Sequence, residues 1–288
     1  MRGVFVQNGF MDSPKFREPG IMLRRAADSM GVQLDILPNK GVCPPIGDRK
    51  SLNALLNDPD FVIFWDKDVR CASNMELCGL RLYNSSECIR ICDDKSLTHI
   101  ELARRGIPSP RTVTSPLTFL QDYDDLSFLD SVPFGFPMVV KDCFGSFGQQ
   151  VHLARDADEL RELFSQGYRP RIIQEYVECG ASDLRIEVVG GVVADCVRRT
   201  GAPGDFRSNC TNGGVMSNHE PSDEESELAI CACEAVGADF AGVDILTGPD
   251  GPMVCEVNSN AHLRNLEKCT GRDVASVILG YITGDVRS

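Results

Sequence analysis

Two neighbouring apolar runs near the C-terminal end of the sequence each contain one carboxylate, and this pattern constrains the fold more than any other feature. Residues 240–246 are apolar except for Asp244, and residues 253–257 are apolar except for Glu256. A carboxylate inside a buried strand is costly unless another group pairs with it. The segment Gly-Pro-Asp-Gly at 248–251 is typical of a tight turn. The two runs are therefore predicted to form a hairpin that contains a charged pair.

The register of this hairpin decides what the charged pair does. If the turn holds an odd number of residues centred on Asp250, Asp244 faces Glu256, and Asn258 follows on the same face. Two like charges facing each other destabilise a sheet unless a cation lies between them. Carboxylate and amide oxygens are ligands that Mg²⁺ prefers, so we predict a metal site that also holds phosphates. The alternative is a one-residue shift that turns one carboxylate to solvent.

A glycine-containing loop follows the apolar run 138–141. Lys141 ends this run, and Gly145 and Gly148 lie in the turn before the next predicted strand, 151–154. Such a loop can turn backbone N–H groups towards phosphate oxygens while the lysine supplies positive charge. It lacks the pattern of a Walker A loop. A plain hairpin with a surface lysine therefore explains it equally well.

Charged residues also gather on a third predicted hairpin. The pair Gly190-Gly191 is typical of a two-residue turn, which places Asp183 directly across from Arg198. Arg185 and Glu187 share the face of Asp183. Ordinary ion pairs on a solvated strand face, worth about 0–1 kcal/mol each, are the alternative to a functional cluster.

The remaining pattern alternates strands with helices. Strands over 4–6, 32–37 and 61–65 with a helix over 20–30 predict a parallel sheet, and no dinucleotide-binding glycine motif follows the first strand. Ser222 and Glu225 have the spacing of a capping box for a helix that ends at Gly237. Further helices are predicted over 93–105 and 157–166, a strand over 171–177 and a linker over 112–131.

Composition narrows the compartment and the class of partner. The net charge of −13 argues against a nucleic-acid surface, so any polyanion site must concentrate positive charge locally. No apolar run approaches the roughly 18 residues that span a bilayer, and no signal peptide is evident, so we expect a cytoplasmic protein without a membrane partner. The thirteen cysteines include no C-x-x-C pair and are expected to be small buried apolar residues.

Taken together, the motifs resemble the ATP-grasp superfamily, in particular its RimK-like branch, which includes glutamate-adding ligases and LysX-like carrier-protein ligases. They occur in the order of that family over residues 93–260: Phe136-Pro-Met-Val-Val-Lys141, Gly145-Ser-Phe-Gly148, Gln174-Glu-Tyr-Val177, Asp183-Leu-Arg185, Gly204-Asp-Phe-Arg-Ser-Asn209, Gly213-Gly214, Phe240-Ala-Gly-Val-Asp244 and Glu256-Val-Asn258. Phe147 resembles the aromatic residue found at this position in the carrier-protein branch. The segment Asn258-Ser-Asn-Ala-His262 lacks the proline that often follows the metal-binding asparagine in the family.

The resemblance implies a site for ATP and for Mg²⁺, with Mn²⁺ as a substitute. The residues that would contact the nucleotide are Lys95, Lys141, Gly145, Ser146, Gly148, Gln174, Glu175, Tyr176, Val177, Asp183, Arg207, Ser208 and Asn209. Among these, Gln174–Val177 would be the strand beside adenine, and Arg207 and Lys141 would be catalytic. Asp244, Glu256 and Asn258 would hold metal ions, and Arg198 and Arg199 a substrate carboxylate.

The resemblance also implies an α/β (α+β) fold in three parts. These are an N-terminal parallel-sheet α/β domain over 1–92, a central lid subdomain with the glycine loop over 93–173, and a C-terminal antiparallel-sheet subdomain with the metal site over 174–288. ATP would lie between the last two parts.

The implied activity is that of an ATP-dependent carboxylate–amine ligase, which converts ATP to ADP and phosphate by way of an acyl phosphate. An amino acid such as glutamate would be joined to a small molecule, a peptide or a carrier protein, and a homo-oligomer is expected by analogy. The alternatives are a non-catalytic nucleotide-binding protein and a phosphotransferase that forms no amide.

Overall fold

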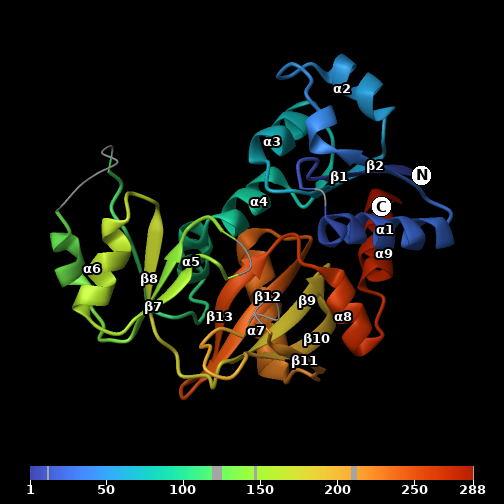
Figure 1. Ribbon diagram of the computed structural model, residues 1–288. Coiled ribbons are helices and arrows are strands. Elements are labelled where there is room, and N and C mark those ends of the chain that lie inside the picture. The colour runs from blue at the N-terminus through green and yellow to red at the C-terminus, as the bar shows by residue number, and fades with distance from the viewer. Residues whose placement is uncertain (12, 119–124, 146–147, 209–212, 288) are drawn as a thin grey trace.

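Three β-sheets, each with its own helices, make up the part of the chain that the structure describes (Figure 1). The computed structural model describes residues 1–11, 13–118, 125–145, 148–208 and 213–287, and the backbone alone for 285–287. The mixed α/β fold with one parallel and two antiparallel sheets confirms the predicted fold class.

The N-terminal sheet is parallel, as predicted, with the strand order β2-β1-β3-β4. Its elements are β1 (Arg2–Gln7), α1 (Pro14–Ser29), β2 (Gln33–Pro38), the 3₁₀ turn η1 (Asn39–Gly41), α2 (Arg49–Leu56), β3 (Phe61–Trp65), α3 (Val69–Leu77), β4 (Leu82–Tyr83) and α4 (Ser86–Asp93). Helix α1 begins six residues before the predicted start, because Pro14 has the fixed backbone angle that suits a first helical turn.

The predicted helix over 93–105 is confirmed with a start two residues later, and the sequence analysis did not predict the short helix α4 before it. Helix α4 ends at Asp93 and α5 (Lys95–Arg104) begins at once, because the Asp94 side chain accepts a hydrogen bond from the backbone N–H of Ser96 and caps the new helix. This cap fixes Lys95 as the first residue of α5.

The central sheet is antiparallel with the order β5-β8-β6-β7. Its elements are β5 (Thr112–Thr114), the 3₁₀ turn η2 (Ser127–Ser131), β6 (Met138–Asp142), β7 (Val151–Ala154), α6 (Ala157–Ser165) and β8 (Arg171–Glu175). β5 and η2 occupy both ends of the predicted linker, whose residues 119–124 lie outside the described part. The linker prediction was therefore wrong at its ends, since β5 pairs with β8.

The C-terminal sheet is antiparallel with the order β11-β10-β9-β12-β13. Its elements are β9 (Ser182–Val189), β10 (Val192–Thr200), β11 (Val215–Asn218), α7 (Asp223–Val236), β12 (Phe240–Gly248), β13 (Gly251–Asn258), α8 (Leu263–Thr270) and α9 (Val274–Arg287). The predicted capping box of Ser222 and Glu225 is confirmed at the start of α7. Helix α7 shares a core with Leu184 and Ile186 of β9, so the alternating charged residues of β9 lie on the opposite face.

Helices α8 and α9 join the C-terminal sheet to the N-terminal one (Figure 1). Helix α9 packs against α1, and Ile278 and Ile282 of α9 share one buried cluster with Phe5 of β1 and Phe240 of β12. The predicted boundary between residues 173 and 174 falls within β8. No helix in the described ranges is long and apolar enough to cross a membrane.

Both predicted hairpins of the C-terminal sheet form, and each contains a bulge. Between β9 and β10 the extra residue is Ala194, which shifts the pairing by one, so Asp183 lies opposite Arg199. The predicted pairing of Asp183 with Arg198 was wrong, because a two-residue turn without a bulge was assumed. Arg198 lies opposite Leu184 instead.

The β12–β13 hairpin reaches the predicted pairing by another route. Its turn holds two residues, since Gly248 pairs with Gly251, which contradicts the predicted odd turn. A bulge at Cys255 then shifts the register back by one, so Asp244 lies opposite Glu256. The predicted pairing of these two carboxylates is confirmed.

Candidate active site

One cavity of about 1220 Å³ touches all three sheets. Its wall contains nine lysine and arginine residues against seven aspartates and glutamates, in a chain whose net charge is −13. Positive charge is therefore concentrated at this place, as a polyanion site in an acidic chain requires.

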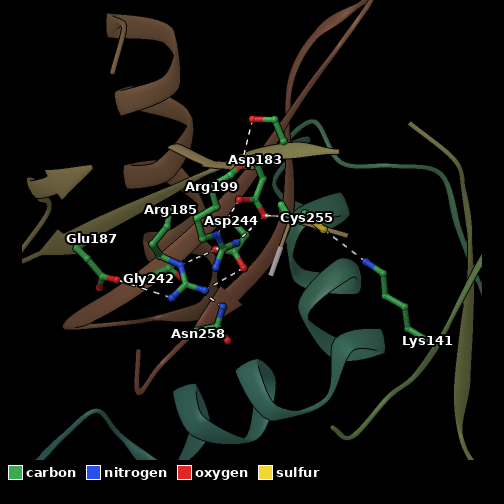
Figure 2. A network of polar contacts seen from close by, with 11 residues as sticks. Lys141, Asp183, Arg185, Glu187, Arg199, Gly242, Asp244, Cys255 and Asn258 are labelled. Carbon is green, nitrogen blue, oxygen red and sulfur yellow. Dashed lines mark hydrogen bonds and ion pairs between the residues drawn. The ribbon is translucent and has the colours of Figure 1, made fainter. Parts of the chain in front are cut away.

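Two buried lysines from different elements end in this cavity. The Nζ atom of Lys95 donates to the carbonyl oxygen of Gly145 at 3.2 Å and lies 3.4 Å from Oε1 of Glu256. The Nζ atom of Lys141, at the end of β6, lies 3.4 Å from Sγ of Cys255 (Figure 2). Both ammonium groups thus reach the surface formed by β13, where phosphate oxygens would meet two positive charges.

The glycine loop contacts the segment after β10. Gly148 has a φ of +70°, which favours glycine, and its carbonyl oxygen accepts a hydrogen bond from Nη1 of Arg207 at 2.9 Å. Asp205 binds the same guanidinium through Nε and Nη2. Gly145, Gly148, Arg207 and Ser208 all line the cavity, whereas the predicted site residues Ser146 and Asn209 lie outside the described residues.

The strand predicted to lie beside adenine is an inner strand of the central sheet. β8 pairs with β5 and β6, so the backbone of Gln174 lies between two neighbouring strands. The side-chain amide of Gln174 donates to Thr112 and to Nε2 of His99, each at 2.8 Å. Burial lowers the pKa of His99 to about 3, helped by Lys141, so its ring is neutral and accepts this bond. Tyr176 and Val177 follow the end of β8 on the cavity wall.

A ladder of alternating charges crosses the face of β9, β10 and β12 that lies away from α7 (Figure 2). Arg199 binds Asp183 through Nε at 2.7 Å and Nη2 at 2.5 Å, and its Nη2 lies 2.9 Å from Oδ1 of Asp244. Arg185 donates to Asp244 through Nε at 2.5 Å and Nη2 at 2.9 Å. Three guanidinium nitrogens therefore surround the Asp244 carboxylate.

Burial and pairing act in opposite directions on the acids of this ladder. Burial alone would raise the pKa of Asp244, but Arg185 and Arg199 outweigh it and hold the pKa at about 2. Burial raises the pKa of Glu187 to about 7, and Arg185, its guanidinium neighbour on β9 at 3.9 Å, opposes this rise only in part. Asp244 is thus ionised at neutral pH, whereas Glu187 titrates close to neutral pH.

Three oxygen-bearing side chains of the hairpin suit a hard cation. Asp244, Glu256 and Asn258 line the cavity together. The Asn258 Nδ2 atom donates to the carbonyl oxygen of Gly242 at 3.4 Å, and Figure 2 shows its oxygen pointing away from Arg185. Glu256 is 30% exposed, and Asp244 keeps about one of its four lone-pair sites beside the three guanidinium nitrogens. These donors fit a Mg²⁺ or Mn²⁺ ion.

The cavity unites most of the predicted site residues. Those on its wall are Lys95, Lys141, Gly145, Gly148, Gln174, Glu175, Tyr176, Val177, Asp183, Arg199, Arg207, Ser208, Asp244, Glu256 and Asn258. Arg198 is not on the wall, because the bulge at Ala194 turns it to the other face of the sheet.

The sequence prediction missed the N-terminal part of the wall. Asn8, Trp65 and Asp66 line the cavity at the carboxyl ends of β1 and β3, beside Lys15 of α1 and His262 before α8. After β1 the chain crosses to β2 on one side, and it then returns to β3 on the other side of β1. The position between the carboxyl ends of β1 and β3 is therefore where ligands usually bind in open parallel sheets. The strand order, had it been predicted, would have pointed to these residues.

Known proteins similar to this chain identify its family. The family model of the RimK-like ATP-grasp domain matches residues 92–282. The chain is 34% identical over 269 residues to the uncharacterized protein MG012 homolog of Mycoplasma pneumoniae, covering 91% of this chain and 92% of the relative. It is 37% identical over 216 residues to a probable alpha-L-glutamate ligase 2 of Hahella chejuensis, covering 73% and 69%.

The fold is also similar to that of solved ligase structures. The D-alanine–D-alanine ligase of Bacillus anthracis complexed with ATP superposes with a TM-score of 0.70 over 99% of this chain and 97% of its own, at 19% identity. The match to the family model covers well over half of the chain, and the charged cavity lies within the matched region apart from its N-terminal wall. The chain therefore belongs to the RimK-like ATP-grasp family of ATP-dependent carboxylate–amine ligases.

Proposed function

We propose that this ligase activates a carboxylic acid with ATP and transfers the acyl group to an amine, with glutamate as one of the two partners. The observation that carries the proposal is the convergence of Lys95, Lys141 and Glu256 from three different elements on one cavity wall. The resemblance to a probable alpha-L-glutamate ligase supports glutamate as the amino acid.

The nucleotide would lie between the central and C-terminal sheets. Since Gln174 is enclosed on both sides by β5 and β6, recognition of the adenine edge would fall to Tyr176 and Val177 beyond the strand. Lys95 and Lys141 would neutralise the phosphates under the loop that contains Gly145 and Gly148.

The metal ion would be held by Asp244, Glu256 and Asn258. When bound, it would neutralise charge on the transferring phosphoryl group. The carboxylate of the acid would attack the γ-phosphorus of ATP, and the bond between this phosphorus and the β–γ bridging oxygen would break, so that ADP leaves with the electron pair. A neutral amine would then attack the acyl carbon, the bond from that carbon to the phosphate oxygen would break to expel phosphate, and the amine nitrogen would lose one proton to the phosphate or to solvent. Arg207, held by Asp205, would stabilise the oxyanion of this second step.

The partners and the compartment follow from the same proposal. Small-molecule or peptide substrates, or a carrier protein, would enter along the N-terminal wall beside Lys15 and His262. The described cysteines are free thiols, which supports the cytoplasm. Similarity to the family supports a homo-oligomer and the three-part domain division, with the first boundary at residue 92 and the second after β8 rather than within it.

The test is ADP release with Mg-ATP over a panel of amino acids, each alone and with a candidate acyl acceptor. We expect glutamate with an amine or acid partner to stimulate release. Glu256→Gln serves as the blank, and Arg198→Ala, outside the cavity wall, serves as the matched control that keeps full stimulation. Failure of the wild-type protein to bind ATP would contradict the proposal.

A further inference from the structure

Glu187 is a buried carboxylate next to the active site that the proposed reaction does not use. Glu187 on β9 is 3% exposed, it does not line the cavity, and among the residues that the structure describes its Oε1 atom has no hydrogen-bond partner. A buried acid with an unpartnered oxygen is costly, so its presence in the strand requires a physical reason.

The sheet provides space for this carboxylate at one position. Gly242 of β12 lies opposite Glu187, and a Cβ atom at Gly242 would come within 2.7 Å of Glu187 Oε1. The acid therefore lies on the far side of Arg185 from Asp244, and Figure 2 shows the guanidinium between the two carboxylates. Arg185 has one acid that faces the cavity and one that is withdrawn from it.

A divalent cation at Asp244 changes the charge balance of this ladder. Asp183 and Asp244 balance Arg185 and Arg199, and the cation adds two positive charges beside two guanidinium groups. Arg199 retains two hydrogen bonds to Asp183. The cation would repel Arg185, and Glu187, whose Oε1 atom lies 3.9 Å from Nη1 of Arg185, is positioned to offset this repulsion in addition to the negative charges on the cavity side.

We propose that Glu187 is the counter-charge that lets a divalent cation share Asp244 with Arg185, which makes Glu187 a positioning residue of the metal site. The inference rests on the proposed function, since that proposal is what assigns a metal ion to Asp244. It adds a role for a residue that lies outside the cavity and contacts neither substrate.

The surroundings of Glu187 set the conditions for a test. The charged groups that face it are Arg185 on its own strand, Asp195 and Arg199 on β10, and Asp244 on β12. Burial is the largest cause of its raised pKa of about 7. At pH 8 the carboxylate is therefore ionised, and a change to glutamine removes a full charge while nearly keeping the shape.

The experiment measures Mn²⁺ binding to the full chain with a non-hydrolysable ATP analogue at pH 8, from the electron paramagnetic resonance signal of free Mn²⁺. We expect Glu187→Gln to weaken Mn²⁺ binding by roughly tenfold or more, as expected for one unit charge lost at this range. Glu187→Asp should stay within about threefold of wild type. Glu76→Gln, a part-buried acid of the N-terminal unit that binds Ser86, is the matched control and should not change.

A double variant separates charge balance from simple damage to the fold. In Arg185→Gln/Glu187→Gln both members of the pair are neutral, so Mn²⁺ affinity should return to near the wild-type value. This variant also carries the test if Glu187→Gln alone does not fold. Equal Mn²⁺ affinity in wild type and Glu187→Gln, or a double variant as weak as the single one, would overturn the inference. Absence of Mn²⁺–nucleotide binding in the wild type would instead overturn the proposed function.

Discussion

The two hairpins of the C-terminal sheet are built alike and differ in where they place their charges. Each has a two-residue turn and one bulge, at Ala194 in β9–β10 and at Cys255 in β12–β13. In β9–β10 the bulge brings Arg199 to Asp183, so this pair of opposite charges lies inside the protein, and it also places Asp195 opposite Glu187 away from the cavity wall. In β12–β13 it brings Glu256 to Asp244, so like charges meet at the cavity.

The comparison teaches that the opposite charges that pair inside the protein and the like charges that meet at the cavity belong to different hairpins of one sheet. The first hairpin supplies guanidinium groups that keep Asp244 ionised, and the second places carboxylate and amide groups on the cavity wall. Charges of the first hairpin should therefore matter most for stability, and exposed charges of the second for activity.

The largest expected effect tests the first hairpin. Arg199→Ala should lower the free energy of unfolding by about 3–5 kcal/mol, because it leaves Asp183 buried without a guanidinium and Asp244 with one fewer. Arg198→Ala, on the neighbouring residue, should cost less than about 1 kcal/mol. Urea unfolding of both variants measures the difference, and equal costs would show that the bulge does not select between the two arginines.

An intermediate effect concerns the acid of the first hairpin that is least well paired. The folded-state pKa of Glu187, about 7, lies above its ordinary 4.5, so its contribution to stability is complete below pH 4.5 and lost as the pH rises through 7. Between pH 5 and pH 8 the wild type should lose about 2–3 kcal/mol relative to Glu187→Gln. Urea unfolding at both pH values checks this, and a constant difference between the two proteins would argue against the raised pKa.

The smallest effect on stability is expected in the second hairpin. Glu256 is 30% exposed and its lysine partner is 3.4 Å away, so Glu256→Gln should change the unfolding free energy by less than about 1 kcal/mol. Its ADP release should nevertheless fall by at least about 100-fold, because the proposed metal ligand is lost. A thermal unfolding curve and the ADP-release assay, both measured on Glu256→Gln, check this prediction. A large loss of stability would show that the charges of both hairpins stabilise the fold to a similar degree.

Much of the fold could be predicted because its signals are local. The Gly190-Gly191 turn, the capping box at Ser222 and the apolar runs of β3 and β12 depend on neighbouring residues alone. The cavity residues carried by the glycine loop and by β13 were found through motifs with fixed spacing. The family and its fold were therefore accessible from the sequence.

The features that could not be predicted depend on distant contacts. No local signal marks Ala194 or Cys255 as bulge residues, so one register was wrong and the other was right for a wrong reason. The short helix α4 was not predicted, since Ile91 and Cys92 are buried against distant residues of the C-terminal sheet. The N-terminal wall near Trp65 depends on the strand order β2-β1-β3-β4, which the sequence does not state.

The packing of α9 against α1 sets the order in which this protein can fold. Phe5 and Leu23 of the first elements share their buried cluster with Ile278 and Ile282 of α9. During synthesis, the part of this apolar face that α1 does not cover therefore stays exposed until α9 has left the ribosome. Contacts between such distant residues also make folding slow. The N-terminal sheet, although made first, should complete its packing last, and the nascent chain should need protection of that face until then.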